Sequence, residues 1–301
     1  MIYISLAFLL LIAVVINNAA LAVLLGIFFS LVYKPNTSFI SRKISTIPLQ
    51  IGIVFLGFTI SANYVLDIGT KYFLWITLFV LLSFFGGLFL SRLFNLNKNL
   101  SILLSAGAAI CGGTAIAAIA PIIKAKPEEL ILSLTIIFIF NTIALLTFPF
   151  IGSALGMSSI EFGSFAALAV HDTSSVVGTA LEYSSESVEV AATLKLGRTL
   201  WLIPLILLLN YKNKTNSRNA YPKFILFFII AIIANTFLKI SYETILSLRL
   251  ISQTFLMVGL FCIGTQSASI NINMLTLKPI SFSLTLWVLA IPSAYFIVTV
   301  I

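Results

Sequence analysis

Eleven apolar runs follow one another along this chain of 301 residues, with only short polar breaks between them. They lack the alternation of apolar and polar residues that marks outer-membrane strands, so we interpret them as helices. A helix needs ~20 apolar residues to cross a bilayer. The pattern predicts an all-α membrane protein with about 11 transmembrane helices; ten is the alternative, because Asn17 and Asn18 alone separate the first two runs. The runs cover approximately residues 3–16, 19–33, 47–62, 72–91, 100–122, 130–150, 163–181, 188–210, 222–239, 248–269 and 279–300.

The composition agrees with lipid as the main solvent. Hydrophobic residues make up 60% of the chain and charged residues 9%, against roughly 45–50% and about 25% in soluble domains. Two cysteines and one histidine are too few for a disulfide framework or a cysteine-rich zinc site, so we expect no metal and no cofactor. The net charge of +8 is explained by membrane orientation rather than by a nucleic-acid partner.

Loop charges predict that orientation, because cytoplasmic loops collect Lys and Arg. If the loop after the second run is cytoplasmic, ten basic residues and a single acid, Glu161, lie on that side. The other side receives seven acids and five basic residues: Lys71, Lys124, Lys126, Lys239 and Arg249. We therefore expect a multi-pass protein of a bacterial inner membrane, with a cytoplasmic N-terminus and the C-terminus outside. The first helix is expected to be retained, although Asn17-Asn18-Ala19-Ala20 could pass for a cleavage region.

A short internal repeat predicts the domain organisation. The sequence around Cys111 recurs around Cys262, 151 positions later, with five of nine residues identical. Five helices in each half would invert the second half relative to the first, as in many secondary transporters. The prediction is an extra N-terminal helix (residues 1–17) followed by two inverted five-helix repeats, residues 18–151 and 152–301, each with a broken helix that crosses the other.

The first candidate site combines the two repeated segments. Gly112, Gly113 and Thr114 lie deep in the fifth run, where two glycines cost about 1 kcal/mol each in a helix and favour unwinding. The tenth run supplies the expected counterpart: Gly264, Thr265 and Gln266. Broken helices expose free N–H groups that suit an anion. The alternative is that these small residues only allow close helix packing.

The second candidate site contains the ionisable residues of the apolar runs. His171, Asp172 and Thr173 lie in the seventh run, unless that run ends earlier and they cap the next helix. Lys195 and Arg198, three positions apart, share a helix face in the eighth run. We expect them to point inward, with snorkelling to the interface as the alternative. The net positive charge then favours an anionic substrate, and His171 is a candidate for proton coupling.

These residues also carry a family resemblance that extends over essentially the whole chain. Ile110-Cys111-Gly112, Val170-His171-Asp172-Thr173 and Lys195-Leu196 with Arg198 resemble the YeiH-type family of proposed sulfate exporters, bacterial inner-membrane proteins. Ser174-Ser175 depart from the Ala-Gln that usually follows His-Asp-Thr in that family. The resemblance implies a transporter related to the bile-acid symporter and cation/proton antiporter folds, with inverted repeats and broken crossing helices.

The sequence thus predicts a secondary active transporter, acting as an exporter of a small anion such as sulfate or an organic acid, with alternating access around a midplane site. The coupling ion, H⁺ or Na⁺, and a homodimer are left open. The alternative within transport is a cation/proton antiporter that uses Asp172. An intramembrane enzyme that uses His171 and Asp172 is the third reading, but no complete catalytic set is apparent, so we expect no enzymatic activity.

Overall fold

The computed structural model describes residues 2–36, 39–44, 47–213, 223–238, 240–266 and 276–301, and every regular element within them is a helix. The chain is therefore all-α, as the apolar runs predicted. The helices are α1 (Ile2–Ile16), α2 (Ala19–Tyr33), α3 (Ile40–Lys43), α4 (Ile47–Gly57), α5 (Ala62–Leu93), α6 (Lys98–Ala109), α7 (Gly113–Ile119), α8 (Pro127–Ala154), α9 (Ser159–Ala169), α10 (Thr173–Tyr183), α11 (Ser185–Thr199), α12 (Leu202–Asn213), α13 (Lys223–Leu238), α14 (Tyr242–Gly264) and α15 (Leu277–Val300).

Five described segments are long and apolar enough to cross a membrane: α5, α8, the nearly continuous pair α11–α12, α14 and α15. Shorter apolar helices, among them α1, α2, α4 and α13, accompany them. Large apolar side chains remain exposed along these helices, as on Phe73, Phe89 and Phe237. In water such a surface would be unfavourable, whereas lipid solvates it. The structure is that of a multi-pass membrane protein.

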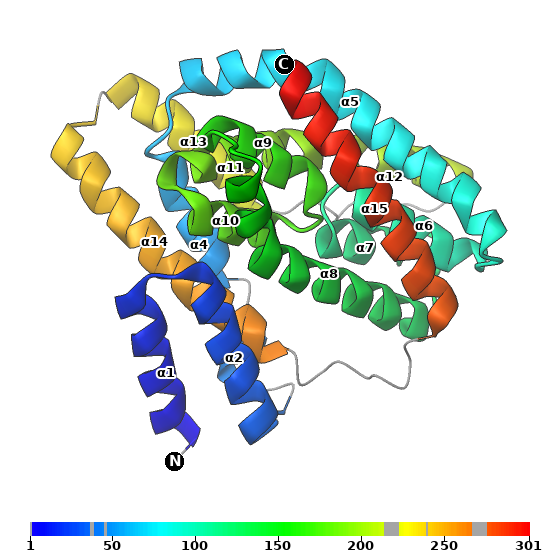
Figure 1. Ribbon diagram of the computed structural model, residues 1–301, viewed down its shortest axis with the longest axis horizontal. Helices are drawn as coiled ribbons and strands as arrows, with labels where there is room; N and C mark the ends of the chain where they lie inside the picture. Colours follow the sequence, from blue (N-terminus) through cyan, green and yellow to red (C-terminus); the bar gives the residue numbers. More distant parts are fainter. Residues whose placement is uncertain (1, 37–38, 45–46, 214–222, 239, 267–275) are drawn as a thin grey trace.

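The helices form two bundles that touch along a limited interface (Figure 1). The small bundle contains α1, α2, α4, α13 and α14, and α14 is its centre because it packs against both α2 and α4. The large bundle contains α5 to α12 together with α15. Contacts between the bundles are made mainly by α10, which lies against α2 and α14, and by α5 against α13.

Helices α6 and α7 form a hairpin that returns to the face of the molecule from which it enters. Gly107 of α6 packs against Ile116 of α7, so the two helices lie side by side. The side chain of Asn99, at the start of α6, donates to Glu129, at the start of α8, over 3.4 Å. Because both ends of the segment lie together, residues 98–126 are a re-entrant hairpin, here called hairpin 1, and its entry side is the hairpin-1 face.

Helices α9 and α10 form a second hairpin with the same construction. The Ser184 hydroxyl, just after α10, lies 2.9 Å from the Ser159 hydroxyl at the start of α9. The rings of Phe162 and Tyr183 stack with centroids 4.0 Å apart, and the Tyr183 hydroxyl donates to the carbonyl of Met157. Residues 158–184 are therefore hairpin 2.

The two hairpins enter from opposite faces because α8 connects them. This helix has 28 residues, so it is roughly 42 Å long, enough to cross a bilayer. Its first turn contacts hairpin 1 at Asn99, and near its other end Gly152 contacts Phe162 and Tyr183 of hairpin 2. The entry side of hairpin 2 is here called the hairpin-2 face.

This arrangement corrects two of the eleven predicted crossings. The fifth and seventh apolar runs, residues 100–122 and 163–181, each turn back instead of crossing. Apolarity and length alone do not distinguish a crossing helix from a buried hairpin, because both are shielded from water. The division into repeats 18–151 and 152–301 stays a prediction. The two segments that were matched differ in structure: Cys111 lies at the tip of hairpin 1, whereas Cys262 lies within the continuous helix α14.

Candidate functional site

The tips of the two hairpins meet inside the large bundle. Gly112, at the tip of hairpin 1, has φ +58° and lies against Asp172, at the tip of hairpin 2. A Cβ atom on Gly112 would lie 3.0 Å from both Cα and Cβ of Asp172, so only glycine allows this approach. The fifth apolar run is therefore broken at Gly112, as predicted. The break contacts the tip of hairpin 2, at Asp172, and not residues 264–266, which were the predicted counterpart.

Asn141 of α8 holds the tip of hairpin 2 from one side. Its Oδ1 accepts from the backbone N–H of His171 at 3.2 Å and from that of Asp172 at 3.4 Å. Trp287 of α15 holds the other side, since its Nε1 donates to the carbonyl of Ala169 at 3.1 Å. Asp172 then begins α10 as its N-cap, with its carboxylate accepting from the N–H of Ser174 at 3.0 Å.

Two fully buried cations lie at the hairpin tips, and one of them, Arg198, ties the C-terminal ends of α6 and α9 together. Arg198 donates to the carbonyls of Ala109 (2.7 Å) and Ala108 in hairpin 1, and to those of Ala167 (3.0 Å) and Leu168 (2.7 Å) in hairpin 2. A positive charge is favourable at the negative end of a helix dipole. Arg198 is thus a clamp between the hairpins.

Lys195 has a similar role within hairpin 2. Its Nζ donates to the carbonyl of Val170 at 2.7 Å and lies 3.5 Å from that of Ala167. We expected Lys195 and Arg198 to face the substrate; they do point inward rather than snorkel, but neither lines the cavity described next. Their hydrogen bonds serve the backbone instead, because an unwound helix end in an apolar interior leaves carbonyls that need donors.

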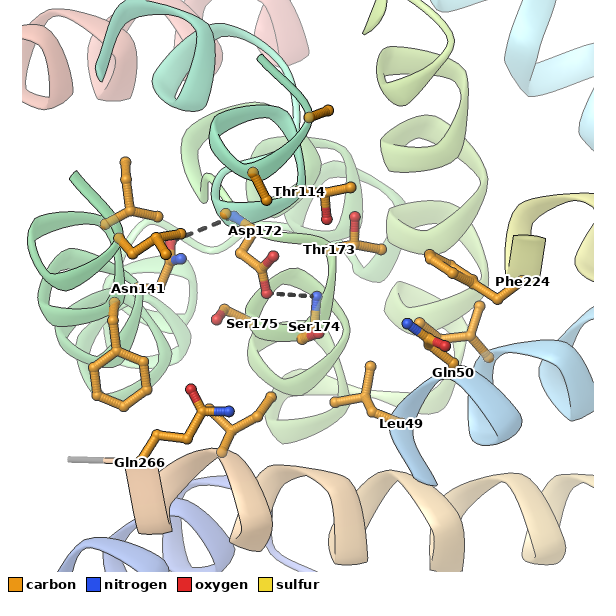
Figure 2. A pocket seen from close by; sticks show the side chains of 18 residues that line it. Leu49, Gln50, Thr114, Asn141, Asp172, Thr173, Ser174, Ser175, Phe224 and Gln266 are labelled. Carbon is orange, nitrogen blue, oxygen red and sulfur yellow. Dashed lines mark hydrogen bonds between the residues drawn. The ribbon is translucent and has the colours of Figure 1, made fainter. Parts of the chain in front are cut away.

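A cavity of about 570 Å³ lies in front of the hairpin tips, between the two bundles (Figure 2). The large bundle contributes residues of α7, α8 and α10, and the small bundle contributes residues of α4, α13 and α14. The size is that of a small-molecule site. Among the described lining residues, Asp172 is the only charged one; the other polar side chains are Gln50, Thr114, Asn141, Thr173, Ser174, Ser175 and Gln266.

The cavity extends from the tips toward the hairpin-1 face. Leu49 lies at the start of α4 and Phe224 at the start of α13, and Gln266 follows the end of α14. These chain ends lie on the hairpin-1 side, because the opposite end of α13 contacts the start of α5 through Thr236 and Ala62. The cavity is therefore asymmetric across the molecule.

Of the predicted site residues, five line this cavity: Gly113, Thr114, Asp172, Thr173 and Gln266. Gly112 lies behind them at the contact between the tips. His171 is buried beside the tip, and its Nδ1 has no hydrogen-bond partner among the described residues. The sequence offered two interpretations of Asp172, a helix cap and a site residue. The structure agrees with both, because Asp172 caps α10 and also borders the cavity.

Gly264 and Thr265 are not at the cavity. A Cβ atom on Gly264 would collide with the carbonyl of Val23 and lie 3.0 Å from Cα of Gly26, so α2 and α14 approach closely there. The Thr265 hydroxyl donates to the carbonyl of Cys262 (2.7 Å) and contacts the Ser41 hydroxyl (3.0 Å). Helix α14 ends at Gly264, with Thr265 as its C-cap, so the helix stops where the break was predicted. The small residues also allow close helix packing here, and whether a second half-helix follows lies outside the described residues, since residues 267–275 are not among them.

Asn141 and Gln50 were missed by the sequence analysis as site residues. Both are amides within otherwise apolar runs, and Asn141 is only 4% exposed. Polar side chains inside membrane segments usually face the protein interior or a cavity. The sequence therefore carries a signal for both residues.

The fold and the cavity define a multi-pass membrane protein with an internal polar site between two helix bundles. A family model described as Conserved hypothetical protein 698 matches residues 2–283. A UPF0324 membrane protein of Bacteroides thetaiotaomicron is 38% identical over 270 residues, which cover 89% of this chain and 82% of that protein. Another, of Porphyromonas gingivalis, is 38% identical over 277 residues, covering 89% and 83%.

The chain belongs to this family of UPF0324 membrane proteins. The family membership is in line with the resemblance carried by the Ile-Cys-Gly and His-Asp-Thr motifs. No solved structure matches the chain.

Proposed function

We propose that this protein is a secondary active transporter of a small anion, working by alternating access at the cavity between the bundles. The observation that carries the proposal is the meeting of two re-entrant hairpins, from opposite faces, at Gly112 and Asp172 on the wall of that cavity. Irregular backbone at membrane depth is tolerated where it is buried or lines a cavity, and transporters place their sites at such broken helices.

The charges around the tips support an anion as the substrate. Two helix N-termini (α7 and α10) and two C-termini (α6 and α9) meet there, so their dipole contributions roughly cancel. The formal charges of Lys195, Arg198 and Asp172 leave a net charge of +1 when each group is ionised. A positive region at membrane depth favours an anion, because low dielectric strengthens the attraction.

The contacts between the bundles support a structure closed at the hairpin-2 face. Glu182, near the end of α10, accepts from the backbone N–H groups of Ala19 (3.0 Å) and Ala20 (3.3 Å) and from the Asn18 side chain, at the start of α2. Arg249 of α14 pairs with Glu189 of α11 at 2.5 Å. Both contacts join the small bundle to the large one, whereas the cavity extends toward the opposite face. Movement of one bundle along the other would close the cavity at the hairpin-1 face and open it at the hairpin-2 face.

The re-entrant hairpins also sharpen the orientation that we propose. Lys124 and Lys126 now join the face that carries most loop cations, and Glu161 joins the opposite face. The basic residues assigned to the two faces change from ten and five to twelve and three; of these, Lys214, Arg218 and Lys239 lie outside the described residues. We accordingly propose that the hairpin-1 face and the N-terminus are cytoplasmic in a bacterial inner membrane, with the C-terminus outside.

A cation/proton antiporter is the second candidate, because Asp172 is the only charged residue among the described lining residues. In that case the carboxylate would bind the cation or the proton in turn. We propose transport in preference to catalysis because His171, the chain's only histidine, does not line the cavity, so no histidine is in place there to activate the hydroxyls of Ser174 and Ser175. The Asp172 carboxylate on the same wall is already engaged as the N-cap of α10. The coupling ion, H⁺ or Na⁺, and a homodimer are not distinguished by this geometry.

Thermal unfolding of the detergent-purified protein tests the proposal, because a ligand that binds the folded state raises the melting temperature. Sodium sulfate, lactate, propionate and chloride are compared at equal ionic strength, and sodium is exchanged for choline in a parallel series. The anion transporter predicts stabilisation by at least one oxyanion, independent of the cation. Stabilisation by Na⁺ alone, abolished in Asp172→Asn, would instead establish the antiporter.

A further inference from the structure

We infer that Asn141 and Asp172 form a donor–acceptor pair that selects a small acid carrying a hydrogen-bond donor of its own, such as a hydroxy acid or a protonated oxyanion. The inference rests on the proposed transport function and names its substrate class. It follows from how the two side chains are held at the tip of hairpin 2.

The orientation of the Asn141 amide is determined by its neighbours. Two backbone N–H groups, of His171 and Asp172, point at one end of the side chain, so that end must be the carbonyl oxygen Oδ1. The Nδ2 end then faces away from the tip and into the cavity that Asn141 lines (Figure 2). The residue is 4% exposed, yet its Nδ2 donates to none of the described residues. Nδ2 is not one of the fully buried side-chain atoms that lack a partner, so it opens onto the cavity, where a water molecule or a ligand can accept from it.

Asp172 offers the complementary group on the same wall. Its carboxylate accepts from the N–H of Ser174 and also interacts with the Ser174 hydroxyl and the N–H of Ser175. A carboxylate has about four lone-pair sites, so one is left for a ligand in the cavity that Asp172 borders. Its backbone N–H is bonded to Asn141, so the two residues lie next to each other. In Figure 2 their side chains border one space, with Ser175 below them. Asn141 thus supplies a hydrogen-bond donor, and Asp172 beside it supplies an acceptor.

A ligand that matches this pair has an acceptor oxygen for Asn141 and an O–H or N–H for Asp172. A fully deprotonated anion such as sulfate has no donor, so it would leave Asp172 unpaired and repelled. The buried Lys195 and Arg198 offset the charge of Asp172 but present their own donors to the backbone. The predicted class is therefore a monoanionic hydroxy acid or protonated oxyacid, in preference to the sulfate suggested by the sequence.

Lactate and propionate are the matched probes, because they differ by one hydroxyl group and share the carboxylate. We expect lactate to stabilise the purified protein with an apparent Kd at least tenfold lower than that of propionate or sulfate. Asn141→Asp keeps the acceptor for both backbone N–H groups while removing the donor. The new carboxyl group lies beside Asp172, so the melting temperature without ligand should fall, and lactate binding should weaken at least tenfold. Asn141→Ala, which removes the donor without adding a charge, should weaken lactate binding by a similar factor.

The outcomes separate this inference from the function on which it rests. If no anion stabilises the wild-type protein, the proposed transport function fails. If lactate and propionate bind equally well, or if Asn141→Asp binds lactate as the wild type does, the donor–acceptor pair is overturned while anion transport stands. Should Asn141→Asp not fold, Asn141→Ala is compared with Phe138→Ala, which alters an apolar lining residue of the same helix; equal lactate affinity in these two would also overturn the inference.

Discussion

Gly112 lies directly against Asp172, and this contact joins two hairpins that enter the protein from opposite faces. The glycine has a positive φ and no room for a side chain, whereas the aspartate caps α10 and borders the cavity. A side chain at position 112 would therefore have to displace the backbone of Asp172, which carries the carboxylate. The packing of the tips and the chemistry of the cavity depend on the same pair of residues.

Gly112→Ala should destabilise the protein more than a glycine substitution that introduces strain alone. A left-handed alanine costs about 1–2 kcal/mol, and forcing its Cβ against Asp172 adds about 1–3 kcal/mol of overpacking. Gly156 is the control, since its φ is +64° but nothing lies within 4 Å of a Cβ there. Melting temperatures of the two detergent-purified variants give the comparison, and equal losses would show that the tips do not touch as described.

Arg198→Met should destabilise the folded protein even without ligand. The methionine fills most of the volume but leaves carbonyls of both hairpins without donors, at about 1–3 kcal/mol for each buried group left unsatisfied. Arg198→Lys should recover only part of this loss, because one amine cannot replace a planar guanidinium with five N–H groups. Arg92→Met is the control, since Arg92 is exposed. An unchanged melting temperature in Arg198→Met would contradict the clamp.

The part of the fold that the sequence can predict is the part that apolar patterns report. Apolar runs reveal shielding from water, so the helical class was recovered, and with it the bounds of α1 (Ile2–Ile16) and α2 (Ala19–Tyr33). Other bounds differ by several residues: the run 72–91 belongs to α5 (Ala62–Leu93), and the run 100–122 is divided between α6 and α7. The glycine pair at 112–113 marked a true break. Runs do not reveal the direction in which a segment continues after a break, because a returning half-helix is as apolar as a crossing one. The two hairpins therefore could not be predicted from the sequence.

The candidate site shows the same limit. Intramembrane charge singled out Lys195 and Arg198, which are fully buried, and Asp172, which is half-buried at the cavity. The presence of a charge does not show whether a buried cation faces a ligand or donates to backbone carbonyls, since in both cases the cation is paired and buried. Gly264 shows a related limit: a small residue at which a helix ends and one that lets two helices touch look alike in sequence, and this glycine does both.

The re-entrant topology predicts the accessibility of four exposed positions. Lys98→Cys and Lys124→Cys should both be modified from the hairpin-1 face, and Ser158→Cys and Ser185→Cys both from the hairpin-2 face. A membrane-impermeant maleimide applied to intact spheroplasts and to inverted vesicles reports the face, in a background without the two native cysteines. Eleven crossing helices would place the members of each pair on opposite faces.

Glu182 is predicted to keep the hairpin-2 face closed. Its carboxylate accepts from the N-terminal end of α2, where a negative charge is favoured by the helix dipole as well as by hydrogen bonds. Glu182→Gln keeps an acceptor but loses the charge, which weakens contacts of this kind by about 0.3–1 kcal/mol. The population open at the hairpin-2 face should then rise several-fold.

Ser175→Cys reports that population, because Ser175 lines the cavity and would be reached from the hairpin-2 face only after opening. In the background without native cysteines, maleimide labelling of intact cells should be faster with Glu182→Gln than without it. Glu186→Gln, on an exposed residue of the next helix, should leave the rate unchanged. Equal rates in all three proteins would mean that Glu182 only stabilises the start of α2, and that closure of this face depends on apolar packing of α10 against α2 and α14.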